Sequence, residues 1–499
     1  MNIIDCYKLK IKNKKIILIC ILLLGLFLRI YKAPDFFLYN HDSDLAGWFV
    51  RDVVENKHIR LIGQETSTQG IFIGPLYYYL LIPFYLIFYL DPIGGVFLVT
   101  ILGMFTIWSF YFVFKKVFNN NTGLVAAFIY SVSFYSIFND REVVPTMPVV
   151  LWTVWYFYSL NLLLKGEHTK GLVFSGILIG LIWHLNFALV LLGPLILLSL
   201  YLSKMPIRLK NLLYGIVALL LTSLPLILFE LRHNLSQVNW FIRAITAKDQ
   251  HDVFSGVAKL FRVLSLTGKN ITGIMWGTLM PVRYEHLLLI FLVIFAIVVR
   301  KKLITRQIGV IMSAWFLLYI IFFSSYSKIV SEYYLNGLTL LWILILSVSV
   351  SALLERRKFK RVGLSILLIF SLINIYRFFT LQPNRSGYIE KRGIVRLIKE
   401  DALKNEYHCI AISYIADPGY DFGYRYFFWL EKMHVNRPES GSPVYTIVYP
   451  MKPIFEHDIS FGAIGLIYPD YSRYTMDEVE ISCSGDNSNL TDPMFGFTN

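Results

Sequence analysis

Residues 16–52 read IILICILLLGLFLRIYKAPDFFLYNHDSDLAGWFVRD. The stretch begins with an apolar run over residues 16–28, and five lysines between positions 8 and 15 precede that run. Because no small-residue cleavage site follows, this pattern predicts an uncleaved signal anchor rather than a secretory signal. A polar segment that contains four charged residues within 41–44 and 51–52 then follows on the far side of the membrane.

The composition of the whole chain indicates a polytopic α-helical membrane protein. Of the 499 residues, 56% are hydrophobic and only 16% are charged, which is too apolar for a soluble globular protein. Apolar runs of about 20 residues are counted as membrane spans. Beyond the first run, spans are predicted at 94–114, 122–138, 147–164, 211–229, 286–299, 306–324, 333–352 and 361–379.

Basic clusters predict the orientation of these spans, since short cytoplasmic loops carry an excess of Lys and Arg. All the clusters are cytoplasmic only under two conditions. The stretch 171–202 must form a pair of short spans around WHLN, and the stretch 71–90 must not cross the membrane. The second stretch is rich in tyrosine and contains Pro75 and Pro83, which favours an interfacial or re-entrant helix. The pattern then gives about 11 spans, a cytoplasmic N-terminus and a long outer loop over 230–285. The clusters after the N-terminal lysines lie at 115–116, 165–170, 204–210, 300–306 and 356–361.

The net charge of +14 is therefore a topology signal and gives no support to a nucleic-acid partner. Residues 1–380 are predicted to form the transmembrane domain. Residues 381–499 are predicted to form a small extracytoplasmic α/β domain, because 387–406 has an amphipathic helical pattern and three apolar runs with strand character follow it. No CxxC spacing suggests a zinc site, and Cys409 and Cys483 are one option for a disulfide.

The first outer segment offers carboxylates at the membrane surface. His41, Asp42 and Asp44 precede an amphipathic helical pattern over 45–56, with Arg51 near the polar face of that helix. A carboxylate at this depth is able to accept a proton from the hydroxyl of a substrate that attacks a lipid-borne group. The alternative is that Asp42, Ser43 or Asp44 only caps the helix.

Two further outer segments carry candidate residues. Asp140 and Glu142, in FNDREVV, lie between two spans, where charges are also common as boundary markers. Arg232 and His233 close a span in FELRHN, and an arginine on the outer side runs against the positive-inside bias. A guanidinium in that position suits a phosphate, whereas a lone histidine is more often structural than a metal ligand.

Two outer turns contain weaker candidates. Lys328, in YSKIVSEYYL, is a second option for a phosphate contact, and Tyr333 is either a substrate contact or an aromatic-belt residue. His184 and Asn186, in WHLN, either reach the same cavity or only satisfy their own turn. The sequence contains no P-loop, GxSxG motif, dinucleotide-binding fingerprint or EF-hand loop.

The order of HDSDLAGWFVRD, GPLYYYLL, NDRE and FELRHN resembles bacterial GT-C glycosyltransferases of the family 39 kind, which include relatives of protein O-mannosyltransferases and aminoarabinose transferases. The resemblance covers about residues 16–350 and implies a GT-C fold. It places the catalytic aspartate of the family at Asp42, with Asp44 as the alternative, and a second acidic site at Asp140 or Glu142. The chain departs from the family at Gly74, where relatives often have a charged residue, and at Asn186, where many have histidine.

The resemblance implies transfer of a sugar from a polyprenyl-phosphate donor to a protein, lipid or glycan acceptor at the outer face of the cell membrane. Asp42 is the expected base, and the expected contacts to the donor are Arg51, Tyr77, Arg232, His233, Lys328 and Tyr333. No cofactor is certain and no metal ligands are assigned, although a divalent metal is left open. The alternatives are a lipid-linked oligosaccharide ligase or polymerase, and a transporter, which commonly has ionisable residues within its spans.

Overall fold

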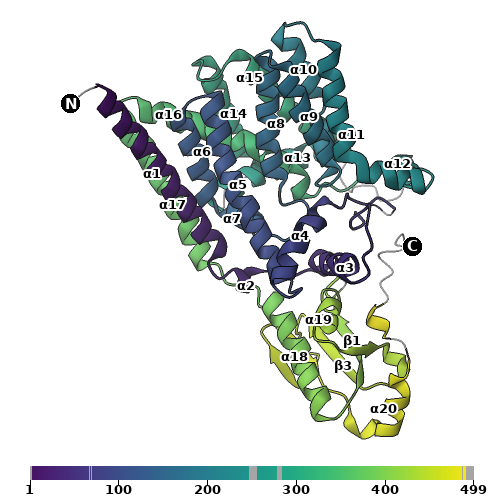
Figure 1. Cartoon of the computed structure of the whole chain (residues 1–499). Coiled ribbons are helices and arrows are strands. Elements are labelled where there is room, and N and C mark those ends of the chain that lie inside the picture. The colour runs from purple at the N-terminus through teal and green to yellow at the C-terminus, as the bar shows by residue number, and fades with distance from the viewer. Residues whose placement is uncertain are drawn as a thin grey trace. The chain divides into compact units, whose positions relative to one another are not determined.

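The computed structural model describes residues 3–66, 68, 70–246, 256–277, 284–417, 419–485 and 487–490. The chain divides into two compact units, each of which is discontinuous in sequence (Figure 1). The helical unit comprises Met1–Tyr31, Val99–Asp140 and Pro145–Leu381. The mixed unit comprises Lys32–Leu98, Arg141–Val144 and Gln382–Asn499, so it combines the first outer segment with the C-terminal segment.

Long apolar helices make up the helical unit, as the apolar runs predict. In the described part of the chain, five helices are long and apolar enough to cross a membrane: Ile93–Val117, Leu209–Arg232, Arg306–Ser325, Glu332–Glu355 and Lys360–Thr380. The count of about 11 spans stays a prediction. The helices of the unit are α1 (Ile3–Ile30), α5 (Ile93–Val117), α6 (Asn120–Val132), α7 (Phe134–Asn139), α8 (Val149–Leu164), α9 (His168–Ile182), η1 (Phe187–Leu192), α10 (Pro194–Ser203), α11 (Leu209–Arg232), α12 (Ser236–Thr246), α13 (Gly256–Trp276), α14 (Tyr284–Arg300), α15 (Arg306–Ser325), η2 (Glu332–Leu338), α16 (Thr339–Glu355) and α17 (Lys360–Thr380).

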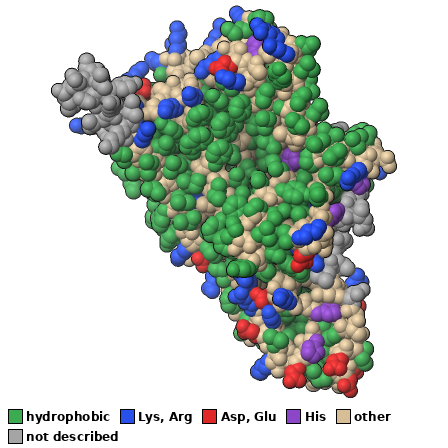
Figure 2. Space-filling view, in the orientation of Figure 1, with side chains coloured by type: hydrophobic (Ala, Val, Ile, Leu, Met, Phe, Trp, Pro, Cys, Tyr) green, Lys and Arg blue, Asp and Glu red, His purple; other side chains and the backbone are tan. Residues whose placement is uncertain are grey.

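The surface of these helices is largely apolar. Figure 2 shows hydrophobic side chains over most of the visible helical face, and the exposed side chains of α11 include Leu213, Ile216 and Leu220. Exposed apolar patches of this extent are unusual in soluble monomers and suit contact with lipid.

Three of the predicted inner segments lie together at one end of the helices. The Lys14 ammonium donates a hydrogen bond to Asn121 Oδ1 at 3.1 Å, and the amide of Asn121 donates to Glu355 Oε1 at 3.1 Å. These contacts join α1, the start of α6 and the end of α16. The cytoplasmic location of this end stays a prediction.

The stretch 171–202 folds back on itself. α9 and α10 are antiparallel neighbours in sequence, and His168 Nε2 at the start of α9 lies 3.3 Å from Ser203 Oγ at the end of α10. The chain reverses at 183–186, where Asn186 caps η1 by accepting a hydrogen bond from the Ala188 N–H at 2.9 Å. Buried His184 lies with Nε2 3.0 Å from the Thr222 carbonyl oxygen of α11, so Asn186 is engaged within the turn and His184 by a neighbouring helix.

The segment 230–285, which is predicted to be a long outer loop, contains two helices, α12 and α13. Its location outside the membrane stays a prediction. α13 buries Val263, Ile271 and Ile274 while it exposes Val257 and Phe261, which gives it one packed face. It contacts α14, α15 and α17. Polar residues spaced along α13 lower its mean hydropathy below that of a membrane span. The sequence signal for this helix is therefore its amphipathic periodicity.

The mixed unit contains a five-stranded sheet in the order β2-β1-β3-β5-β4, which agrees with the predicted C-terminal α/β fold. β1 is parallel to β2 and β3, whereas β5 is antiparallel to both of its neighbours, β3 and β4. The Cys409–Cys483 disulfide joins β1 to α20, so that pairing is confirmed. The elements are α2 (Ala33–Phe36), α3 (His41–Glu55), α4 (Leu76–Ile87), α18 (Tyr388–Lys404), β1 (Cys409–Ala416), α19 (Arg425–Leu430), β2 (His434–Asn436), η3 (Pro438–Ser440), β3 (Val444–Tyr449), β4 (Ile459–Phe461), β5 (Ile464–Ile467), η4 (Tyr471–Arg473), α20 (Met476–Cys483) and η5 (Ser488–Leu490).

α4 is short for a membrane span. Its 12 residues include Pro83, and a helix of this length extends over roughly 18 Å, compared with about 30 Å for the hydrocarbon core of a bilayer. This length agrees with the interfacial or re-entrant helix predicted for 71–90, whose place relative to the membrane stays a prediction.

Candidate active site

Helix α3 presents two carboxylates in its first turn, and neither of them caps it. The cap is Asn40, whose side chain accepts a hydrogen bond from the Ser43 N–H at 3.1 Å. The alternative that Asp42, Ser43 or Asp44 is the cap is therefore wrong. Both carboxylates are available for contacts outside the first turn of the helix.

Asp42 is half-buried and lightly bound. Its Oδ1 accepts a hydrogen bond from Gln64 Nε2 at 3.1 Å. Burial raises the pKa of Asp42, and this effect exceeds the lowering by the nearby His41 ring and by the Gln64 hydrogen bond.

Gln64 is brought beside α4 by a short backbone ladder. The Gly63 N–H donates to the Ile73 carbonyl at 2.6 Å, and the Ile73 N–H donates back to the Gln64 carbonyl at 3.0 Å. The Gln64 N–H in turn donates to the Tyr78 hydroxyl at 3.4 Å. This ladder fixes the residue that contacts Asp42 against the first turn of α4.

Two tyrosines of α4 lie near Asp42. The pKa values of Tyr77 and Tyr78 are raised mainly by burial and further by the negative charge of Asp42. Within the described residues, the buried Tyr77 hydroxyl has no hydrogen-bond partner. It leaves an unsatisfied donor close to the carboxylate.

Glu142 is the second carboxylate of this cluster. Its side chain is accessible to solvent and is nevertheless surrounded by enough protein atoms that desolvation is the main cause of its raised pKa. The charge of Asp42 raises the pKa of Glu142 further, so the two carboxylates lie within electrostatic range of each other. Among the described residues, neither of them forms an ion pair with Lys or Arg.

Asp44 differs from Asp42 because it is buried and fully engaged. It accepts hydrogen bonds from the Tyr426 N–H at 3.1 Å, the Tyr39 hydroxyl at 3.2 Å and the Trp48 indole N–H at 3.3 Å. Burial raises its pKa, whereas the Tyr426 N–H and the charge of Lys391 oppose that rise. These contacts give Asp44 a structural role in holding α3.

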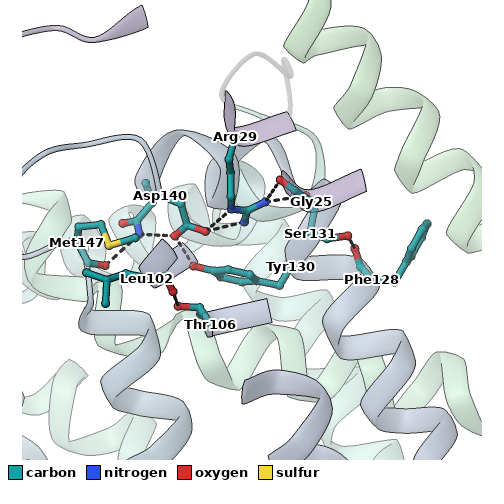
Figure 3. Close-up of polar contacts among 10 residues, drawn as sticks. Gly25, Arg29, Leu102, Thr106, Phe128, Tyr130, Ser131, Asp140 and Met147 are labelled. Atoms are coloured by element: carbon teal, nitrogen blue, oxygen red, sulfur yellow. Dashed lines mark hydrogen bonds and ion pairs between the residues drawn. The ribbon is translucent and has the colours of Figure 1, made fainter. Parts of the chain in front are cut away.

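Asp140 lies in a buried ion pair in the helical unit (Figure 3). Its Oδ2 is 2.8 Å from Arg29 Nε and 2.6 Å from the terminal nitrogen Nη2 of the same arginine. The Tyr130 hydroxyl donates to the other carboxylate oxygen at 2.6 Å, and both charged side chains are inaccessible to solvent. Of the two acids in the second outer segment, Glu142 is the one that belongs to the same unit as Asp42.

Arg51 lies in the C-terminal half of α3, where other side chains already contact it. Its Nε donates to Glu55 Oε2 at 2.8 Å, and its guanidinium lies 5.2 Å from the Trp48 ring and 5.4 Å from the Trp429 ring. These contacts hold the guanidinium between two aromatic side chains.

The remaining candidates lie in the helical unit. Arg232 is exposed at the end of α11, and the adjacent His233 ring stacks on Phe229 with a centroid distance of 4.1 Å. Lys328 is half-buried, and Tyr333 is 41% exposed in η2. No contact among these four side chains is part of the described structure, and their roles toward a donor stay predictions.

The sequence did not identify several residues that organise these sites. No sequence motif marks Gln64. Arg29, by contrast, is recognisable in the sequence, because it is a lone arginine at the end of an apolar run. Lys259, in α13, is also buried, and its ammonium donates to the Lys328 carbonyl at 2.8 Å. Across the described ranges there is no group of three or more His, Cys, Asp or Glu side chains placed to hold a metal.

Comparisons with known proteins agree with this architecture. The family model for dolichyl-phosphate-mannose-protein mannosyltransferases matches residues 73–229. ArnT from Cupriavidus metallidurans bound to undecaprenyl phosphate has a similar structure, with a TM-score of 0.60 and 10% identity over 92% of this chain and 98% of that one. The apo state of ArnT gives a TM-score of 0.60 and 12% identity over 93% and 99%.

A more distant structure is the oligosaccharyltransferase of Archaeoglobus fulgidus, with a TM-score of 0.48 and 13% identity over 87% of this chain and 69% of that one. No curated protein matches the sequence. The resemblance to GT-C glycosyltransferases that the outer-loop motifs predicted is confirmed, by the family model over residues 73–229 and by the fold shared with ArnT over most of the chain.

Proposed function

We propose that this protein is a membrane glycosyltransferase that moves a sugar from a polyprenyl-phosphate donor to an acceptor hydroxyl, with Asp42 as the general base. The family model and the shared fold support this reaction class, and the similar ArnT structure contains undecaprenyl phosphate. The observation that carries the proposal is the half-buried Asp42 carboxylate in the first turn of α3, which is held by a hydrogen bond from Gln64 and forms no ion pair with Lys or Arg among the described residues. Burial raises its pKa and that of Glu142.

In the proposed reaction, the acceptor oxygen attacks the anomeric carbon while its proton passes to Asp42. The bond between the anomeric carbon and the phosphate oxygen breaks, and the polyprenyl phosphate leaves with that electron pair. A raised pKa makes the ionised Asp42 carboxylate a stronger base than an exposed aspartate. Glu142 is then placed to orient the acceptor, and the Tyr77 hydroxyl is able to donate a hydrogen bond to the bound substrate.

Cationic groups are expected to stabilise the departing phosphate. Arg232 is our first candidate because its guanidinium is exposed, and Lys328 is the second. Arg51 is a weaker candidate, since Glu55 and two tryptophan rings already engage it. Each of these assignments is tested by the donor dependence of the corresponding alanine variant.

We place the reaction on the outer face of the membrane. The Cys409–Cys483 disulfide supports this location for the mixed unit, because structural disulfides persist in oxidising compartments. The basic segments gathered around Lys14, Asn121 and Glu355 support a cytoplasmic location for that end of the helical unit.

The test is label transfer by the purified full-length protein in liposomes. Radiolabelled undecaprenyl-phosphate sugars serve as donors and a cell-envelope extract as acceptor. Asp42→Asn is expected to lower transfer by about 10²–10⁴-fold while donor binding is retained. Asp477→Asn, at an exposed position of α20, is the charge-matched control and is expected to be fully active.

Two outcomes contradict the proposal. Full activity of Asp42→Asn would move the base to another carboxylate, with Glu142→Gln as the next variant. Transfer from an undecaprenyl diphosphate glycan with none from the monophosphate donors would instead indicate a ligase or polymerase.

A further inference from the structure

The mixed unit contains a pocket of about 530 Å³ whose lining does not include Asp42. Its lining comes from α2, from the segment before and at the start of α18, and from the edge strand β4. This volume lies in the range of small-molecule sites, which is about 300–1,000 Å³. The side chains that define its chemistry are Asp35, Gln382, Arg385, Glu390, Ser460 and Phe461.

An aromatic platform is built into this pocket. The Phe461 ring lies so close to Gly393 of α18 that a Cβ there would be 2.5 Å from a ring carbon. Glycine at that position therefore allows the ring to pack against the helix backbone. The Phe461 side chain still remains 38% exposed. The ring is thus fixed by its packing, and part of it is left for contact with a ligand.

The rim of the pocket is held in a strained conformation. Arg385 has a φ of +56°, which is uncommon for a residue with a Cβ, and its carbonyl accepts a hydrogen bond from the Ala463 N–H at 2.7 Å. Gly462 has a φ of +66°, and a Cβ there would lie 2.3 Å from the Glu390 Cγ. Backbone strain of this kind persists where the surroundings fix it, and it is common at ligand-binding sites.

Charged and polar side chains around the Phe461 ring remain available to contact a ligand. Glu390 Oε2 accepts a hydrogen bond from the Gly387 N–H at 3.1 Å, which orients its carboxylate. Asp35, Gln382 and Arg385 are exposed, and none of these three side chains forms a hydrogen bond or ion pair with another described residue. The pocket therefore offers two carboxylates, one guanidinium and one amide next to an aromatic ring.

We propose that this pocket binds a carbohydrate and that it holds the glycan acceptor of the transferase, an acceptor role that rests on the proposed function. A pyranose has a face of C–H groups, which suits the Phe461 ring, and a belt of hydroxyls, which suits carboxylate, guanidinium and amide partners. Two carboxylates against one guanidinium disfavour a phosphate or sulfate ligand. A peptide added along β4 would gain few backbone hydrogen bonds, since that strand has only three residues.

The experiment is an array of bacterial cell-surface oligosaccharides probed with the full-length protein in nanodiscs. Glycans that bind are then titrated against variants. Phe461→Ala and Arg385→Asn are each expected to weaken binding about tenfold, as the loss of one aromatic or charged contact implies. Asparagine is chosen at 385 because it tolerates the left-handed backbone conformation.

Controls separate binding from folding and from catalysis. Phe461→Tyr keeps the aromatic ring and is expected to bind the glycan. If Phe461→Ala proves unstable, Arg385→Asn still tests the pocket, because it alters only an exposed side chain. Asp42→Asn is expected to lose transfer and keep glycan binding. If Asp42→Asn transfers normally while the pocket variants lose glycan binding, the proposed catalytic role fails and the binding site stands.

Three results would overturn the proposal. The first is that no glycan binds, and the second is that Phe461→Ala and Arg385→Asn bind as the wild type does. The third is that phosphoethanolamine or an unstructured peptide, and no glycan, competes for the pocket.

Discussion

The Asp44 carboxylate accepts a hydrogen bond from the backbone N–H of Tyr426 at 3.1 Å, although 382 residues separate the two in sequence. Gly47 allows the same approach one turn further along α3, because a Cβ there would be 2.8 Å from the Tyr426 ring. The Tyr426 hydroxyl also donates to the Leu90 carbonyl at 2.8 Å. The C-terminal segment therefore supports the helix that presents Asp42 and is part of the same folded unit.

Asp44→Asn is predicted to destabilise the protein. An amide has one oxygen where the carboxylate has two, so either the Trp48 indole N–H or the N–H and hydroxyl donors on the other side lose their acceptor. Leaving one buried donor unsatisfied costs about 1–3 kcal/mol. Thermal unfolding in detergent measures this change.

The matched control is Asp42→Asn, two residues earlier on the same helix. Its amide oxygen is still able to accept the Gln64 hydrogen bond, so no buried donor is orphaned. Equal unfolding temperatures for Asp44→Asn and the wild type would show that the contact with Tyr426 contributes little to holding α3.

Asp140 is predicted to act through structure rather than through chemistry. Asp140→Asn leaves the buried Arg29 guanidinium without its counter-ion, and breaking a buried pair in this way typically costs about 3–5 kcal/mol. The double variant Arg29→Met/Asp140→Leu removes both charges and is predicted to recover much of the folded yield, which size-exclusion chromatography measures. A double variant that folds and has no transfer activity would assign Asp140 a role beyond the ion pair.

The apolar runs were sufficient to predict most helices of the helical unit, because period and length alone identify a long apolar helix. They were not sufficient for α13, where Lys259 and Asn270 are buried by packing against other elements and read as loop residues in sequence. Burial of a polar side chain depends on partners distant in the chain, and Lys259 finds them at the carbonyls of Tyr326 and Lys328.

The same limitation separates the candidate carboxylates. Asp42 and Asp44 are equivalent in the motif HDSD, and Asp140 and Glu142 are equivalent in NDRE. Only the fold shows that Asp44 and Asp140 are engaged by Tyr426 and Arg29, respectively, while the other two acids lie within electrostatic range of each other. The distinction depends on contacts more than 100 residues apart in sequence, which local patterns do not encode.

The Cys409–Cys483 disulfide is predicted to be a main stabilising element of the C-terminal sheet. It closes a loop of 74 residues, for which the chain-entropy model gives about 4 kcal/mol. Cys409→Ala/Cys483→Ala should therefore unfold at a lower temperature than the wild type under oxidising conditions. With a reductant present, the difference between the two should disappear; a persistent difference would assign the effect to side-chain packing.

Asp42→Asn and Glu142→Gln are predicted to leave the protein as stable as the wild type, or more stable, at neutral pH. The folded-state pKa of each carboxyl is raised above the ordinary value, 3.8 for Asp and 4.5 for Glu, mainly by burial. The folded protein therefore binds these protons more tightly than the unfolded chain does. Above the folded-state pKa values, the two ionised carboxylates oppose folding.

The pH dependence of this effect tests its cause. The stability advantage of the variants should be present at pH 7 and should vanish as the pH falls below 3.8, where both carboxyls are protonated in either state. Thermal unfolding of the variants and the wild type across that range measures it, with Asp477→Asn as the exposed control. A destabilised Asp42→Asn at pH 7 would contradict the prediction, because it would mean that the ionised carboxylate has an attractive partner, such as a bound cation, in the folded protein.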